Sequence, residues 1–202
     1  MNIYVETNFV LELVFQQEQH VQCDEILNLC EQGLAQLIIP AYSLAEPHEK
    51  MTRQRANRRQ LQQNLIDELN QLTRNPLYAV RVNQIQDIAS LLIQSSEEEQ
   101  QRFTLHRNRL LQICTVISLT NAVLTEAASF EVPLALSPQD GLVLASVLAH
   151  LREDNPQASC FLNRNYKDFS NPDIIDELGR YNCRVIGRFD QGLGYIRAQL
   201  QR

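Results

Sequence analysis

The sequence predicts an α/β fold built on a parallel sheet, and three observations support this. Short apolar runs alternate with longer segments of helical periodicity along the 202 residues. The apolar runs are continuously hydrophobic, which is typical of strands buried on both faces of a parallel sheet. Hydrophobic residues make up 44% of the chain, enough for one sizeable core. We therefore expect helices on both faces of the sheet.

The N-terminal 50 residues predict two strands that are each followed by helix. A β-favouring run ends in the carboxylate of Glu6, and apolar residues at helical spacing follow it. Pro40 ends the second apolar run, and Pro47 lies where the first turns of a helix tolerate proline. The expected elements are a strand at 2–6, a helix with Thr7 or Asn8 as N-cap, a helix at 19–34, a strand at 36–39 and a helix from near Ala41.

Residues 50–127 predict two or three long amphipathic helices. Leucine and isoleucine recur at helical spacing in a segment rich in glutamine and arginine, with a break at 74–78. We expect a single domain over residues 1–202 with a helical insertion at about 50–130. The leucine-rich faces would pack on the sheet or form a homodimer surface, and both alternatives remain open.

The C-terminal part of the chain predicts the remaining strands. Continuous apolar runs return after residue 130 and are separated by segments with helical spacing or turn residues. The expected elements are a short strand at 132–136, a helix directly after it, a strand at 158–163, a short helix that ends near Gly179, a strand at 183–187 and a closing helix from residue 190.

Composition and charge exclude several classes of protein. The formal net charge of −6 argues against a simple nucleic-acid-binding module, but not against an enzyme whose acidic cleft holds divalent cations. The five cysteines contain no CxxC pair, so we expect small buried hydrophobes instead of a disulfide framework or a zinc site. No apolar run approaches a membrane span and no leader pattern opens the chain, so we expect a cytoplasmic protein without a membrane partner.

Acidic residues fall at matching places in the predicted topology. Glu6 closes the first strand, and Glu46 lies in the first turns of the helix after the second strand. Asp140 opens the helix after the 132–136 run, and Asp168 follows the strand at 158–163. Right-handed crossovers bring the carboxyl ends of parallel strands to one edge of a sheet, where ligand sites lie. Hard oxygen ligands gathered there suit Mg²⁺ or Mn²⁺.

Each of these residues also has a purely structural explanation. Glu46 and Asp140 could stabilise helix N-termini, with Ser137 as the N-cap in the second case. Asp168 could cap a turn, and asparagines such as Asn163 and Asn165 are ordinary turn residues. The argument for a site depends on their convergence.

Four segments resemble a known family in their order along the chain. They are "IYVETNFVLEL", "IPAYSLAEPHEKM", "LSPQDGLVLASVLAH" and "CFLNRNYKDF", and they cover about residues 1–50 and 130–190. Together they resemble a PIN domain, the fold of many metal-dependent single-strand ribonucleases, including the toxins of bacterial toxin–antitoxin pairs. The resemblance implies a three-layer α/β/α domain, one or two Mg²⁺ or Mn²⁺ ions, RNA as substrate, and an antitoxin or another protein as a kind of partner. By the same resemblance the metal ligands and catalytic acids are Glu6, Glu46, Asp140 and one of Asn165 or Asp168, supported by Thr7, Asn8, Ser43 and Asn163.

The chain departs from the family pattern in ways that keep a second hypothesis open. The first acid of the family is ordinarily aspartate and is Glu6 here, and the neutral Asn165 stands where many members carry a fourth acid. A catalytically weak or inactive PIN-like protein, acting through RNA or protein binding, is therefore the alternative. An aspartyl-phosphate phosphatase is disfavoured because its DxD pair would fall on Glu6 and Asn8.

One dense basic cluster lies in the expected helical insertion. Its functional interpretation is a ridge that contacts RNA phosphates, and its structural interpretation is a solvated helix face paired with Glu49 or Asp67. The candidate RNA-binding residues are Arg55, Arg58 and Arg59.

Overall fold

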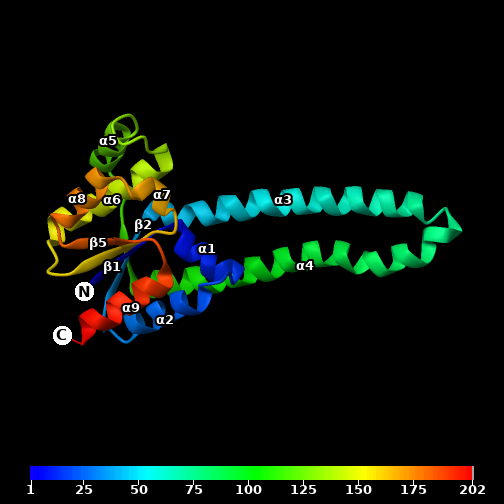
Figure 1. Cartoon of the computed structure of the whole chain (residues 1–202), viewed down its shortest axis with the longest axis horizontal. Coiled ribbons are helices and arrows are strands. Elements are labelled where there is room, and N and C mark those ends of the chain that lie inside the picture. The colour runs from blue at the N-terminus through cyan, green and yellow to red at the C-terminus, as the bar shows by residue number, and fades with distance from the viewer. Residues whose placement is uncertain (202) are drawn as a thin grey trace.

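The computed structural model describes residues 1–201, and for residues 79, 80, 83–86 and 166 it describes the backbone alone. Within the described residues the centre is a five-stranded sheet of order β3-β2-β1-β4-β5, parallel throughout (Figure 1). The predicted α/β class with a parallel sheet is confirmed. The strands are β1 (Asn2–Val5), β2 (Gln36–Pro40), β3 (Cys114–Ile117), β4 (Ser159–Leu162) and β5 (Cys183–Ile186).

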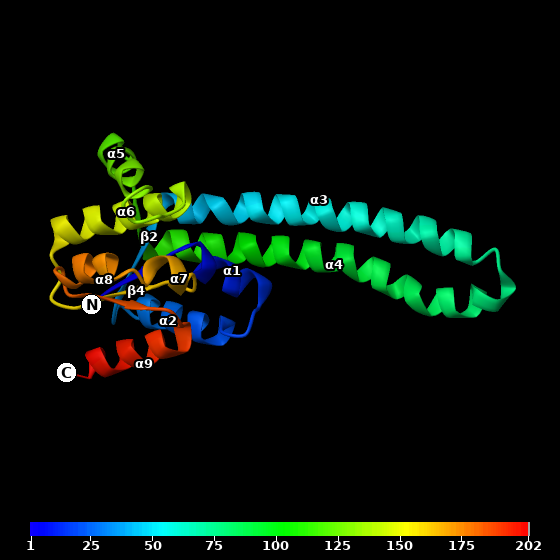
Figure 2. The same ribbon diagram turned by 45° about the horizontal axis from the view of Figure 1, so that its top comes forward.

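Helices cover both faces of the sheet (Figures 1 and 2). On one face, α1, α2, α9 and the last turns of α4 enclose one hydrophobic cluster. On the other face, α6, α7 and α8 enclose a second cluster. The helices are α1 (Thr7–Phe15), α2 (His20–Glu31), α3 (Ala41–Leu72), α4 (Pro76–Ile113), α5 (Asn121–Phe130), α6 (Pro138–Asp154), α7 (Tyr166–Phe169), α8 (Pro172–Gly179) and α9 (Phe189–Leu200).

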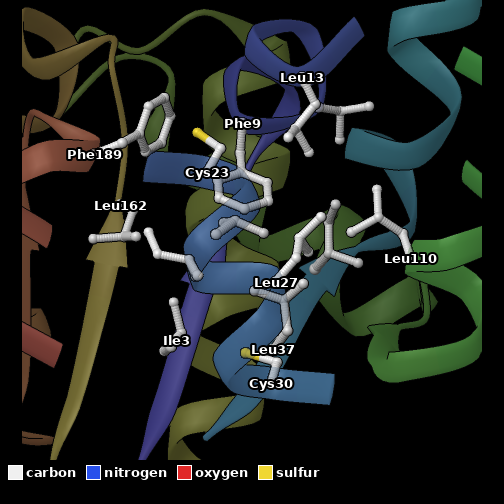
Figure 3. Close-up of a cluster of buried hydrophobic side chains, with 14 of the residues drawn as sticks. Ile3, Phe9, Leu13, Cys23, Leu27, Cys30, Leu37, Leu110, Leu162 and Phe189 are labelled. Atoms are coloured by element: carbon white, nitrogen blue, oxygen red, sulfur yellow. The ribbon is translucent and has the colours of Figure 1, made fainter. Parts of the chain in front are cut away.

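Successive residues of the central strands enter opposite clusters. Ile3 and Leu37 belong to the first cluster, which Figure 3 shows together with Phe9 and other side chains, and Tyr4 and Ile38 belong to the second. All four strand residues are fully buried. Because both faces are covered, every position of these strands can be apolar, which explains the continuous hydrophobic runs in the sequence.

One strand lies elsewhere than the sequence predicts. Residues 132–136 form no strand: Pro133 has no N–H for a sheet ladder, and Ala135 adopts a left-handed conformation with φ of 52°. The corresponding strand is β3 at Cys114–Ile117, inside the segment predicted as helical. It pairs with β2 alone among the described strands and lies at the sheet edge, half exposed, so it lacks the continuous burial that identifies the central strands.

Helices α3 and α4 form a long antiparallel hairpin that projects from the sheet (Figures 1 and 2). Helix α3 continues through Pro47 without a break, and the chain reverses directly after Leu72. The Arg58 guanidinium donates to both carboxylate oxygens of Glu99 on α4, at 2.6 and 3.0 Å. Some leucines on the projecting part, such as Leu61 and Leu72, are solvent-exposed and do not pack on the sheet, whereas Leu69 is buried. No helix in the described part of the chain has both the length and the apolar character that crossing a membrane requires.

The side chain of Gln19 caps α9 from a distant part of the chain. Arg188, at the N-cap position, makes no side-chain cap, and Gln19 Oε1 accepts the backbone N–H groups of Phe189 at 2.7 Å and Asp190 at 3.2 Å. We expect Gln19→Ala to lower the free energy of unfolding by about 1–2 kcal/mol, because these N–H groups lose their acceptor. Urea denaturation measures this. The exposed Gln101→Ala on α4 is the control, and an equal effect of both variants would contradict the prediction.

Candidate functional site

A cavity of about 250 Å³ lies at the carboxyl edge of the sheet, where the end of β1 meets the first turns of α3 and α6 and the loop after β4. We call it the acid pocket. Larger hollows of about 630 Å³ along β5 and 700 Å³ beside α1 are lined by no carboxylate and by one, respectively. The acid pocket is therefore the better candidate for cation chemistry. Its lining residues are Glu6, Thr7, Asn8, Leu11, Glu46, Lys50, Ser137, Gln139, Asp140, Val143 and Asn165.

Glu6 is the most buried carboxylate of the acid pocket, with 6% of its surface exposed. Its Oε2 accepts the backbone N–H of Asn8 at 2.8 Å and so caps α1, while its Oε1 is buried without a hydrogen-bond partner. Glu6, and not Thr7 or Asn8, is therefore the N-cap of this helix. Burial raises the pKa of Glu6 to about 7, and the charge of Glu46 adds to the rise. The N–H dipoles of Asn8 and Arg164 act in the opposite direction.

Glu46 faces Glu6 from the second turn of α3. The hydroxyl of Thr7 donates a hydrogen bond to Glu46 Oε2 and connects the first two acidic segments. Ser43 lies one turn earlier, fully buried, and its Oγ has no hydrogen-bond partner; it does not line the pocket. Of the two hydroxyl residues that the resemblance placed beside the site, Thr7 contacts an acid there and Ser43 lies behind it.

Asp140 enters the pocket from the first turn of α6. Ser137 is the N-cap, as the sequence indicated: its Oγ accepts the Asp140 backbone N–H at 3.1 Å, and its hydroxyl donates to Asp140 Oδ2 at 2.5 Å. The next residue, Gly141, packs against α5, because a Cβ there would lie 3.0 Å from the carbonyl oxygen of Ala127. The close packing against α5 thus explains why a small residue follows this aspartate. Asp140 itself lines the pocket.

The loop after β4 places an amide and not an acid in the pocket. Asn163 is 1% exposed; its Oδ1 accepts the Asn165 backbone N–H at 2.6 Å, and its Nδ2 has no hydrogen-bond partner. Asn165 lines the pocket and its side-chain Nδ2 donates to the carboxylate of Asp168. Asp168 itself is exposed and does not line the pocket. Of the two candidates for the fourth ligand, the structure brings Asn165 to the site.

The predicted basic ridge lies on another face of α3. Arg58 pairs with Glu99 of α4, and not with Glu49 or Asp67 as the structural interpretation expected. Arg55 and Arg59 line a separate hollow of about 290 Å³ between α3 and α4.

Helical spacing separates these arginines from the acid pocket. Arg55 follows Glu46 by nine residues and Arg59 follows Lys50 by nine, so each pair is about 2.5 turns apart and points to opposite sides of α3. The basic residue that lines the acid pocket is Lys50, which the sequence reasoning missed although it lies one turn after Glu46.

The donor set fits a hard divalent cation in its chemistry. Glu6, Glu46 and Asp140 offer carboxylate oxygens, Asn165 offers an amide oxygen, and Glu6 Oε1 is buried without a partner. Within the described residues no three acidic, histidine or cysteine side chains are grouped closely enough to hold a metal ion. Hydrogen bonds to Thr7 and Ser137 hold two of the carboxylates in their present positions.

Comparison with known proteins agrees with this arrangement. A family model described as a PIN domain matches residues 3–169, which include β1, the acid pocket and the loop after β4. No curated protein and no solved structure matches the chain.

Proposed function

The chain belongs to the PIN domain family, whose members are generally nucleases, and from this we propose that it is a Mg²⁺- or Mn²⁺-dependent endoribonuclease that acts at the acid pocket. One observation carries the proposal. Three carboxylates from segments far apart in the sequence, Glu6, Glu46 and Asp140, line one cavity at the carboxyl edge of the sheet. The repulsion between Glu6 and Glu46 and the unpartnered Glu6 Oε1 are offset most simply by a cation.

The residues of the acid pocket have different roles in the proposed reaction. Glu6, Glu46 and Asp140 would hold the ion, with Asn165 as a neutral oxygen ligand. A bound Mg²⁺ or Mn²⁺ supplies charge neutralisation and activation of water for phosphodiester hydrolysis. Lys50, the cationic residue among those lining the cavity, contacts the phosphate. With all three carboxylates ionised, they and the ammonium group of Lys50 give the pocket a formal charge of −2, which disfavours an RNA strand there until a cation binds.

Two observations favour a second candidate function. The three carboxylates are not grouped as a metal site in the described residues, and the fourth position carries the neutral Asn165. A protein with weak metal binding that acts through RNA or protein partners would have this arrangement. A cognate antitoxin and a homodimer formed by the exposed leucines of the α3–α4 hairpin belong to the same set of proposals.

Asp140→Asn separates the two functions. We expect the native chain to bind Mn²⁺ in calorimetry and to cleave single-stranded RNA, and the variant to lose both by at least roughly 100-fold because one ligand charge is removed. The matched control is Asp173→Asn, since Asp173 is also a first-turn acid after an N-cap residue and a proline, Asn171 and Pro172, but is exposed and lies outside the pocket. Native protein without detectable Mn²⁺ binding would refute the nuclease proposal and leave the second function.

A further inference from the structure

The loop after β4 points its side chains in two directions. Asn163 and Asn165 turn toward the sheet edge and the acid pocket, as described above. Arg164, between them, sends its guanidinium the other way, to α1 and the turn after it. The same residue therefore joins the backbone beside Glu6 to the C-terminal half of α1, beyond the residues of that helix that line the pocket.

The partner of Arg164 is a buried carboxylate. Glu12 of α1 is 0% exposed, and its Oε2 accepts a hydrogen bond from Arg164 Nη1. Its Oε1 accepts the backbone N–H of Gln19 at 2.5 Å. Both carboxylate oxygens thus have partners, and the pair is satisfied in the sense that a buried ion pair requires.

The second half of the guanidinium makes a different kind of contact. Arg164 Nη2 lies 2.5 Å from Oε2 of Glu18, whose side chain is 80% exposed. An exposed pair of this kind holds a side chain weakly. The buried Glu12 contact, and not the exposed Glu18 contact, is therefore the one that fixes Arg164.

A buried ion pair is not the most favourable way to fill a core, because hydrophobic residues of similar volume often stabilise a fold equally well. Glu12 lies on a helix whose other buried positions are mostly apolar. The pair does supply a fixed position for the backbone at Arg164, because Arg164 Nη1 donates a charge-assisted hydrogen bond to Oε2 of the fully buried Glu12. The N–H dipole of that backbone lowers the pKa of Glu6. The same backbone leads directly into Asn165, whose N–H donates to Asn163 Oδ1.

We propose that Glu12 and Arg164 are positioning residues of the acid pocket: their buried ion pair holds the 163–165 loop so that Asn165 lines the pocket together with Glu6. This inference rests on the proposed function for its metal-binding readout. Neither side chain lines the acid pocket, so their effect on the ion is indirect. Partners of this kind are worth about 10–100-fold in metal affinity where they orient ligands.

The decisive variant removes both charges. Glu12→Gln/Arg164→Met leaves an acceptor for the Gln19 backbone N–H and leaves no unpaired charge, so its thermal midpoint should stay within about 3 °C of the native value. We expect it to bind Mn²⁺ about 10–100-fold more weakly than the native chain in calorimetry. Arg164→Met alone leaves the Glu12 carboxylate buried without its charged partner and should lower the thermal midpoint by roughly 10 °C.

Two further variants and one metal-free measurement complete the test. Arg164→Lys keeps the charge but shortens the side chain that reaches Glu12 and should give an intermediate affinity, and Glu18→Gln should leave the affinity unchanged. Amide hydrogen exchange of residues 163–165 without metal should be at least roughly tenfold faster in the double variant.

Native Mn²⁺ affinity and native exchange in the double variant would overturn the inference. If the native chain binds no Mn²⁺, the proposed function fails, and exchange at 163–165 alone then decides whether the ion pair positions the loop.

Discussion

Glu6→Gln is expected to stabilise the metal-free protein at pH 8 and to abolish its Mn²⁺ binding. The Glu6 carboxylate is 6% exposed, and its pKa is raised from 4.5 to about 7, first by burial and then by the Glu46 charge. A shift of this size corresponds to roughly 3 kcal/mol between the ionised and the neutral group. Glutamine keeps an oxygen that can accept the Asn8 N–H but carries no charge.

The pH dependence gives this prediction its sign. Because the pKa of Glu6 is higher in the folded than in the unfolded chain, its contribution favours folding below pH 4.5 and is lost as the pH rises through about 7. We therefore expect Glu6→Gln to exceed the native free energy of unfolding by about 1–3 kcal/mol at pH 8, with the difference vanishing below about pH 4. Urea denaturation with a chelator present measures it.

The same variant should lose at least roughly 100-fold in Mn²⁺ affinity at pH 8, because a ligand charge is removed. Glu49→Gln, on the exposed side of α3, is the control and should change neither quantity. Parallel pH curves for the native chain and Glu6→Gln would show that Glu6 is not held in a desolvated position. Higher stability together with lost metal binding would show that Glu6 is retained for function at a cost in stability.

Gly192→Ala is expected to lower the free energy of unfolding by about 2–3 kcal/mol, through a clash between α9 and β4. A Cβ at this position would lie 2.6 Å from Cδ2 and 3.2 Å from Cδ1 of Leu162. Leu162 is fully buried at the end of β4, directly before the loop that enters the acid pocket. Because Leu162 is packed in the core, either its rotamer or the position of α9 must change to admit the Cβ.

Gly194→Ala is the matched control on the same helix. Nothing lies within 4 Å of a Cβ there, so alanine should stabilise the protein by about 0.5–1 kcal/mol through its higher helix propensity. Urea denaturation of both variants measures the contrast. Leu162→Val in the Gly192→Ala background should recover part of the loss, because it removes the clashing methyl groups. Stability changes of the same sign at both glycines would contradict the packing argument.

The sequence determined the parts of the fold whose signal is local. Strands β1, β2, β4 and β5 were found near their observed bounds because they are buried apolar runs between helical segments. Strand β3 was missed because it lies half exposed at the sheet edge and directly follows a long helix. The run at 132–136 has a strand-like composition, but Pro133 and the left-handed Ala135 remove it from a ladder, and Leu136 is buried in the second hydrophobic cluster instead.

Part of the candidate site could likewise be predicted from the sequence, and part required the structure. Glu6 and Glu46 could be placed from the sequence, because they follow strands of a parallel sheet whose carboxyl ends lie at one edge. Asp140 also lines the pocket, from the start of α6, although the strand expected before it at 132–136 does not form. The choice between Asn165 and Asp168 needed the course of the loop after β4.

Contacts between segments far apart in the chain were beyond the sequence. Arg58 pairs with Glu99, 41 residues away on α4, and Arg164 pairs with Glu12, 152 residues away on α1. Burial of Glu6 and its raised pKa follow from the same cause. Hydrophobic periodicity and helix capping depend on residues a few positions apart, so they can be recognised in the sequence alone. Which charged groups meet, and which lose their water, is decided only when the helices pack on the sheet.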